Sequence, residues 1–243
     1  MSKASPYLPN YLSKEIAVQT WMTRSFEFYF IGYALADTTD VHSDVGINLE
    51  PFFCSMGVEF LCKAFSIAEE SESYIHENFE EAKKRIDKIA KKIEHKIKEA
   101  INEIGSDNPT SGISLLLKRE YRPIRTCKDS TKDITGMDVL DCLAKAYIES
   151  RFPQPVLLYE KYPTGDFYYS SVGSSQDIVK FSYALGRELL FLIKEKHQII
   201  LDKKRVDCKL WNDDYRQNFW RIFFPDNTEK NYFIVEKPYV LRT

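Results

Sequence analysis

The chain has 243 residues, 44% of them hydrophobic, which is enough apolar material for one main domain with an appendage. Its formal net charge of −2 excludes a strong global field that would attract nucleic acid or membranes. Any nucleic-acid contact therefore has to come from a local patch.

The cysteines and the beginning of the chain favour a cytoplasmic protein. The five cysteines are scattered and form no CxxC pair, which predicts reduced, mostly buried thiols. The first residues contain no apolar leader, and no stretch approaches the roughly 18 apolar residues of a membrane span. We therefore expect neither secretion nor a membrane contact.

Two helices open the chain. Ser13 can cap a first helix that runs to about Ala36, and a polar stretch follows it. Asn48 can then cap a second helix, in which Pro51 is tolerated in the first turn. The apolar residues that follow predict that this helix continues to about Glu70.

The third helical region has the most regular pattern. Isoleucines and other apolar residues recur at intervals of four and three from Ile75 to Ile104, the seam of a coiled coil or a long helical hairpin. Gly105 is a suitable stop. The pattern predicts a long third helix.

Two further helices follow a connector that runs from Ser106 to Thr135 and contains a short helix at Ile113 to Tyr121. Thr135 and Asp138 resemble a capping box for a fourth helix ending near Glu149. Prolines then forbid regular helix, and a second capping box opens a fifth helix, which runs from Ser174 to about Lys196.

The pattern changes after Lys204. Trp220, Ile222 and Phe224 alternate, a Pro-Asp-Asn turn follows, and alternation resumes from Tyr232 to Val235. This predicts a small C-terminal β-hairpin, which needs the bundle or a partner to cover. The expected organisation is a helical bundle over residues 1–204 and a hairpin appendage over residues 205–243.

Four segments, in this order, resemble the HEPN family of nucleotide- and RNA-associated helical bundles. They are Gly57-Val-Glu-Phe-Leu-Cys-Lys-Ala-Phe65, Glu94-His-Lys-Ile97 with Ile101, Ala146-Tyr-Ile-Glu-Ser-Arg-Phe-Pro153, and Ser174 to Lys196. The resemblance spans about residues 48–197. It implies a mainly α, HEPN-like bundle that forms a homodimer and binds RNA, a nucleotide or a protein partner, in a prokaryotic stress, toxin–antitoxin or phage-defence setting.

The chain departs from this family at the residues that would cleave RNA. Active HEPN ribonucleases resemble one another in an Arg followed by a His after four to six residues, and no Arg here has a His at that distance. Arg187 and His197 come nearest, with nine residues between them, which is about 15 Å along a helix axis. The first hypothesis is therefore a non-catalytic binding module.

Two alternatives stay open. A metal-independent ribonuclease with a rearranged site would use Arg187, His197 or His95 to hold phosphate and move a proton. A structural protein-interaction module would use the third helix and the aromatic hairpin. We expect no cofactor and no metal site, because no histidine is paired at metal-ligand spacing with cysteine or carboxylate and no Gly-rich phosphate loop appears.

The connector is the best candidate for contact with nucleic acid. It carries six cations within fifteen residues, interleaved with Tyr121, which could line a phosphate track while the ring stacks on a base. The cations are Lys118, Arg119, Arg122, Arg125, Lys128 and Lys132. Arg151 has two readings: it can satisfy helix carbonyls or a buried acid such as Glu59, or it can contact a phosphate at a dimer cleft.

Overall fold

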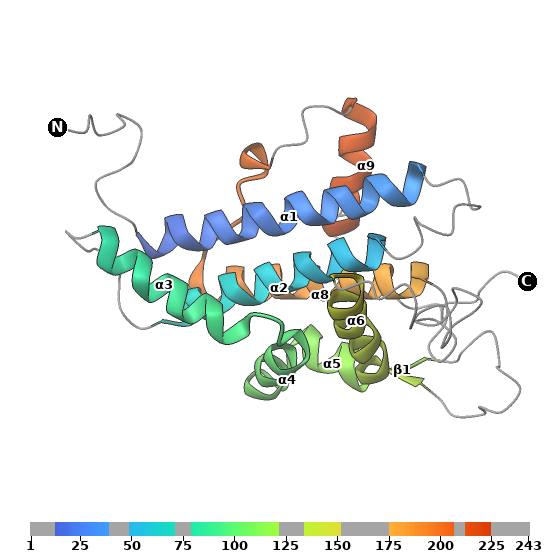
Figure 1. Ribbon diagram of the computed structural model, residues 1–243, viewed down its shortest axis with the longest axis horizontal. Coiled ribbons are helices and arrows are strands. Elements are labelled where there is room, and N and C mark those ends of the chain that lie inside the picture. Colours follow the sequence, from blue (N-terminus) through green and yellow to red (C-terminus); the bar gives the residue numbers. More distant parts are fainter. Residues whose placement is uncertain are drawn as a thin grey trace, which may run out of the picture.

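A computed structural model describes residues 13–38, 49–70, 79–121, 134–151, 175–206 and 212–224 of the chain. These residues are mainly helical, as predicted (Figure 1). The helices are α1 (Lys14–Thr38), α2 (Leu49–Glu69), α3 (Phe79–Ile93), α4 (Ile97–Asp107), α5 (Gly112–Lys118), α6 (Gly136–Arg151), α8 (Ser175–His197), α9 (Asp213–Phe223) and the 3-10 turn η1 (Lys203–Arg205).

The helix α2 is the centre of the bundle. Figure 1 shows α1, α2 and α8 running along the long axis of the molecule, and α2 also contacts α3, α4 and α6. Among the described helices only α2 is long and apolar enough to cross a membrane, by length and composition, yet 72% of its apolar window is buried inside the molecule. Burial of this kind is typical of a core helix.

The buried ring of Tyr29 joins the three long helices. Its hydroxyl donates a hydrogen bond to the Ser182 carbonyl oxygen at 2.9 Å, which connects α1 to α8. A Cβ added at Gly57 of α2 would lie 2.8 Å from the Tyr29 ring, and one at Gly186 of α8 would lie 2.7 Å from its hydroxyl oxygen. Both glycines are therefore needed for the close approach of their helices to Tyr29.

The helix beginnings follow the capping chemistry of the sequence. Ser13 accepts a hydrogen bond from the Ile16 amide at 3.1 Å, as predicted for the first helix. Thr135 and Asp138 form the predicted capping box: the Thr135 amide donates to the Asp138 carboxylate at 2.7 Å, and the Asp138 amide donates to the Thr135 hydroxyl at 3.4 Å. These contacts fix where α1 and α6 begin.

The predicted long third helix is wrong, because α3 and α4 are separate helices. The backbone breaks at His95, whose φ is 63°, a left-handed conformation that a regular helix cannot contain. Glu59 of α2 accepts a hydrogen bond from the His95 amide at 3.4 Å. The break lets Ile93 and Ile97, on either side of it, both be buried.

The prediction that residues 220–224 form the first strand of a C-terminal hairpin is also wrong. Residues 213–223 form the helix α9, and Asn212 caps it by accepting a hydrogen bond from the Tyr215 amide at 2.8 Å. The second predicted strand, residues 232–235, lies outside the described residues. The apolar alternation that suggested a strand therefore occurs at the end of a helix.

Aromatic rings attach α9 to the bundle. Phe219 and Phe223, one helical turn apart, are buried, and the Phe223 and Phe26 ring centroids lie 4.7 Å apart. Each buried ring contributes roughly 1.5–3 kcal/mol relative to an exposed one. That is enough to hold an 11-residue helix that would be marginal in isolation.

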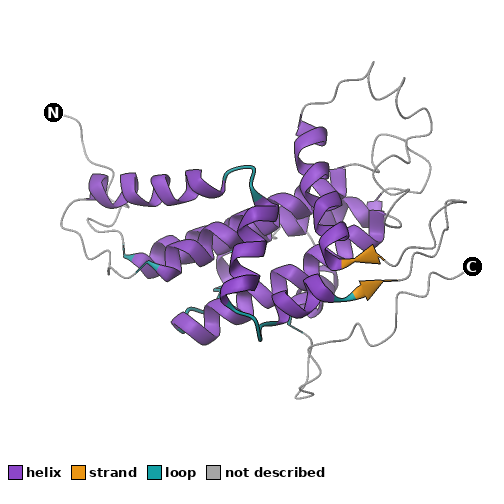
Figure 2. Cartoon of the chain, turned by 90° about the horizontal axis from the view of Figure 1, so that it is seen from below, coloured by secondary structure: helices purple, strands orange, loops and turns teal. Residues whose placement is uncertain are grey.

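Two short strands, of two residues each, pair within the connector and lie on either side of residues 122–133 in sequence (Figure 2). β1 (Glu120–Tyr121) pairs antiparallel with β2 (Ile134–Thr135), and Glu120 lies opposite Thr135. The short helix expected at Ile113 to Tyr121 is α5, which is capped by Ser111 and ends at Lys118, so the expected helix end at Tyr121 is wrong and residues 120–121 form a strand.

Of the five cysteines, the structure describes the surroundings of three. Cys54, Cys62 and Cys142 are buried and carry free thiols, as predicted. Burial raises the pKa of the Cys54 thiol to about 12, so it stays protonated at neutral pH. Cys127 and Cys208 lie outside the described residues.

Candidate functional site

A groove of about 570 Å³ runs along the carboxyl-terminal half of α8. Its other walls are the turn between α4 and α5, residues 199–201 and the end of α9. We call it the α8 groove. It is lined by Asp107, Asn108, Pro109, Thr110, Ser111, Gly112, Leu115, Arg187, Glu188, Leu190, Phe191, Leu192, Lys194, Glu195, Lys196, Ile199, Ile200, Leu201, Phe223 and Phe224.

Exposed apolar side chains gather around this groove. Four large apolar side chains of the described residues are exposed, and three of them, Leu115, Phe191 and Ile200, line it with exposed fractions of 51%, 41% and 59%. The fourth, Ile31, is on α1. Exposed apolar surface of this kind is typical of ligand and partner sites.

Arg187 and Glu188 bring charge into the apolar groove. The exposed fractions of their side chains are only 18% and 7%. Arg187 Nε is 3.9 Å from Glu188 Oε1, and this buried nitrogen has no hydrogen-bond partner within the described part of the chain. A buried donor without a partner costs about 1–3 kcal/mol, and the side chain of Arg187 is part of the groove lining.

Glu188 is held in a setting that disfavours its charge. Burial raises the pKa of its carboxyl group, and Glu195 raises it further, while Arg187 lowers it in part. Gly112 of α5 lies so close that any side chain there would overlap the Glu188 carboxyl group. The close approach of α5 therefore keeps this carboxyl group at the wall of the groove.

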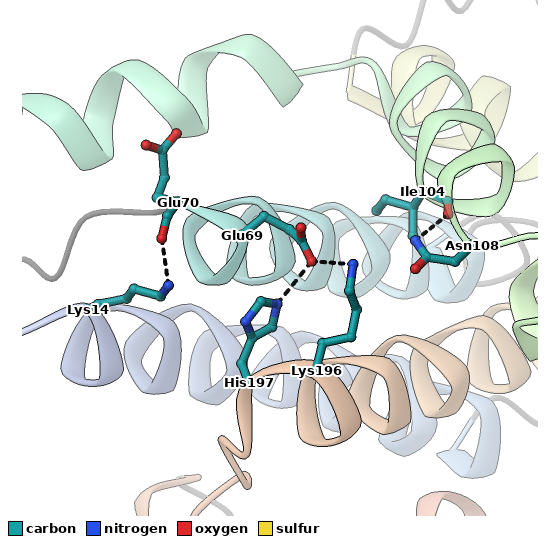
Figure 3. A network of polar contacts seen from close by, with 7 residues as sticks. All are labelled: Lys14, Glu69, Glu70, Ile104, Asn108, Lys196 and His197. Atoms are coloured by element: carbon teal, nitrogen blue, oxygen red, sulfur yellow. Dashed lines mark hydrogen bonds and ion pairs between the residues drawn. The ribbon is translucent and has the colours of Figure 1, made fainter.

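The structure does not bring Arg187 and His197 together. Both lie on the continuous helix α8, ten positions apart, which is about 15 Å along its axis. His197 is not part of the groove lining. Its Nε2 lies 3.0 Å from Oε1 of Glu69 at the end of α2, and the ammonium group of Lys196 lies 2.6 Å from the same oxygen (Figure 3).

The contacts of Glu69 tie the ends of α2 and α8 together. Burial raises the pKa of Glu69, but hydrogen bonds from Lys196 and His197 outweigh it, so the pKa lies below its usual value. Lys14 adds a second tie, from α1, by donating to the Glu70 carbonyl oxygen at 2.6 Å (Figure 3). This arrangement gives His197 a structural partner.

The third histidine candidate, His95, lies in the turn between α3 and α4. Its Nε2 is 3.8 Å from the Glu94 carboxylate, and 39% of its side chain is exposed. It is not part of the groove lining, and it lies outside α8, the helix that carries Arg187 and His197. The described residues thus hold the three proposed catalytic side chains at separate places.

The proposed nucleic-acid contacts are described only in part. Lys118 is the last residue of α5 and is exposed, and Arg119 follows it. For Tyr121 and Arg151 the structure gives the backbone only, in β1 and at the end of α6. Arg122, Arg125, Lys128 and Lys132 lie outside the described residues, so the phosphate track stays a prediction.

Glu59 has a partner other than the suggested Arg151. Lys63, one turn along α2, lies 2.5 Å from its carboxylate, and both side chains are buried. The Lys63 ammonium group also lies over the rings of Trp21 and Phe60, 5.2 Å and 5.1 Å from their centroids. The Glu and Lys of the segment Gly57–Phe65 therefore form a buried ion pair that supports the packing of α1, α2 and the turn at His95.

Sequence reasoning found Arg187 but missed the groove around it. A signal was present in Leu189-Leu190-Phe191-Leu192-Ile193, five consecutive apolar residues on one helix. Successive residues are about 100° apart around a helix, so such a run covers its whole circumference and cannot all face one core. Phe191 is the residue of this run that is left exposed.

Comparison with known proteins leaves the family resemblance as a prediction. The chain matches no protein-family model, no curated protein and no solved structure. Within the described ranges, no three potential metal-ligating side chains come together. The function is therefore argued from the groove itself.

Proposed function

We propose that this protein is a non-catalytic helical binding module whose ligand occupies the α8 groove. The observation that carries this proposal is that three exposed apolar side chains line the same groove as Arg187, whose buried Nε has no hydrogen-bond partner among the described residues. Its volume of about 570 Å³ is within the range of about 300–1,000 Å³ that small-ligand pockets occupy.

The separation of the candidate catalytic groups supports binding over catalysis. A general base has to reach the reacting proton at hydrogen-bond distance, directly or through one water. Arg187 and His197 are about 15 Å apart along α8. His197 also already has Glu69 as its partner.

The ligand class, the oligomeric state and the biological role in this proposal are those that the sequence predicts. RNA or a nucleotide is one class of ligand that the HEPN resemblance implies, and Lys118 and Arg119 are the described part of the basic connector that would contact it. A homodimer, a protein partner and a role in prokaryotic defence are further parts of this proposal. The groove adds the place where binding is to be tested.

A fluorescent probe tests the groove without knowledge of the natural ligand. Anilinonaphthalene sulfonate, an apolar aromatic anion, is expected to bind the full-length protein and to increase in fluorescence. The Phe191→Ser variant should weaken binding about fivefold to tenfold, because it removes part of the apolar wall. The matched control is Ile31→Ser, which removes an equally exposed apolar side chain outside the groove and should leave binding within about twofold of wild type.

Two results would oppose the proposal. Equal binding by the Phe191→Ser and Ile31→Ser variants would remove the groove as the site. Cleavage of mixed cellular RNA that persists in EDTA and is lost in His197→Ala would establish the ribonuclease alternative. We expect no cleavage.

A further inference from the structure

We infer that the α8 groove binds a small apolar molecule that carries one carboxylate, and that Arg187 binds this carboxylate. The inference rests on the proposed function, because it names the chemical class of the ligand for the same groove.

Arg187 supplies the anion contact. Its guanidinium group can hold a carboxylate through two parallel hydrogen bonds, a geometry that an ammonium group cannot offer. It is largely removed from water, and its Nε has no hydrogen-bond partner within the described residues. The 3.9 Å separation from Glu188 is too long for a hydrogen bond, so the neighbouring acid does not satisfy it.

The charges that line the groove disfavour a doubly charged anion more than a singly charged one. The ionisable groups are Asp107 from α4 and, from α8, Arg187, Glu188, Lys194, Glu195 and Lys196. Lys196 already pairs with Glu69 at 2.6 Å. The remaining two cations face three acids, a balance of −1, so the repulsion on a phosphate monoester, with about −1.5 to −2 charges, would exceed that on a single carboxylate.

Glu188 makes a single carboxylate fit better than its formal charge suggests. Burial raises its pKa, so its protonated form is easier to reach than that of an ordinary carboxyl group. A protonated carboxyl group has a hydroxyl that can donate a hydrogen bond to the ligand's carboxylate. Arg187 and Glu188 could then hold the same anion from two sides.

The apolar walls determine the rest of the ligand. Leu115, Phe191 and Ile200 line the groove from α5, α8 and the segment after α8, and they are its exposed large apolar side chains. An aliphatic or aryl chain covered by them would bury apolar surface at roughly 25 cal/mol per Å². The groove volume suits a small free acid rather than a folded partner.

Three probes with the same chain and different head groups test the inference. Octanoate, octanol and octyl phosphate are titrated into the full-length protein by calorimetry at pH 7. Octanoate should bind about tenfold to a hundredfold more tightly than octanol, since hydrogen bonds to charged groups are the stronger ones. Octyl phosphate should bind more weakly than octanoate.

Variants locate the head group. Arg187→Gln should reduce octanoate binding to the level of octanol and leave octanol binding unchanged, while Lys204→Gln, an exposed cation outside the groove lining, should change neither. Arg187→Lys keeps the charge and should retain part of the preference, which separates loss of the contact from loss of folding.

The outcomes separate this inference from the proposed function. Equal binding of octanoate and octanol, or tighter binding of octyl phosphate, would overturn the inference that the ligand carries a carboxylate. The groove would still be the binding site. If a peptide with a free terminal carboxylate binds more tightly than octanoate, and also more tightly than the same peptide with a terminal amide, the inference that the ligand is a small free acid is overturned. Failure of every probe, together with failure of the fluorescent probe, overturns the proposed function itself.

Discussion

At the scale of single residues, Glu188 is the side chain whose environment conflicts most with its charge. It is 7% exposed and lies between α5 and the interior of the groove. Burial is the largest cause that raises its pKa above the ordinary value of 4.5. An ionised Glu188 therefore costs stability in the folded protein, and this cost depends on pH.

The sign of this dependence follows from proton binding. Because its pKa is higher in the folded protein, Glu188 binds more protons there than in the unfolded chain. Its contribution to stability is full below the unfolded pKa and is lost as pH rises through the folded pKa. We expect Glu188→Gln to be more stable than wild type at pH 8, with the difference shrinking towards pH 4.

Urea unfolding at a series of pH values measures this difference. Glu103→Gln, an exposed residue of α4, is the control and should stay within about 0.5 kcal/mol of wild type. A Glu188→Gln difference that is constant with pH, or that grows towards acid, would contradict the environment described for this carboxyl group.

Residue chemistry was predictable from the sequence where it is local. The caps at Ser13 and Thr135 were read correctly, because a cap depends on a few neighbouring residues. Arg187 was also identified, but its neighbours in the groove were not. Leu115 and Ile200 are 85 positions apart in sequence, so only the packing of α5 against α8 brings them to one site.

At the scale of elements, one error lies at a tertiary contact and the other comes from a short alternating run that resembles a strand. The isoleucine repeat continues across the break between α3 and α4, so periodicity alone could not locate it. At the break, the His95 amide donates a hydrogen bond to Glu59, which is 36 residues away in sequence. In α9, the short alternating run concealed the helical pair Phe219 and Phe223 and the cap at Asn212.

A glycine substitution distinguishes a broken helix from a continuous one. His95 has a φ of 63°, where glycine is favoured, so His95→Gly should stabilise the protein by about 1 kcal/mol. In a continuous helix the same change would destabilise it by about 1 kcal/mol. Denaturant unfolding measures whether the substitution raises or lowers the free energy of unfolding.

The control for this prediction is Lys88→Gly, at an exposed position inside α3. It should cost about 1 kcal/mol, as glycine does in a helix interior. If His95→Gly and Lys88→Gly destabilise the protein equally, the separation of α3 from α4 at His95 is contradicted.

At the scale of the whole molecule, the α8 groove is assembled from elements that are distant along the chain. The turn before α5, the second half of α8 and the last residues of α9 each contribute a wall. Tyr29 and the aromatic contacts of Phe26 with α9 hold these elements around the same core. The groove is thus a property of the packed bundle, which explains why no single sequence motif marks it.

The most direct test of the central claim is to map amide chemical shifts of the full-length protein during titration with anilinonaphthalene sulfonate. We expect the perturbed amides to cluster around the groove, at Gly112, Phe191, Glu195 and Ile200, and those around Ile31 on α1 to stay unchanged. Perturbations confined to the basic connector or to the outer face of α1, with none along α8, would contradict the claim that the α8 groove is the binding site.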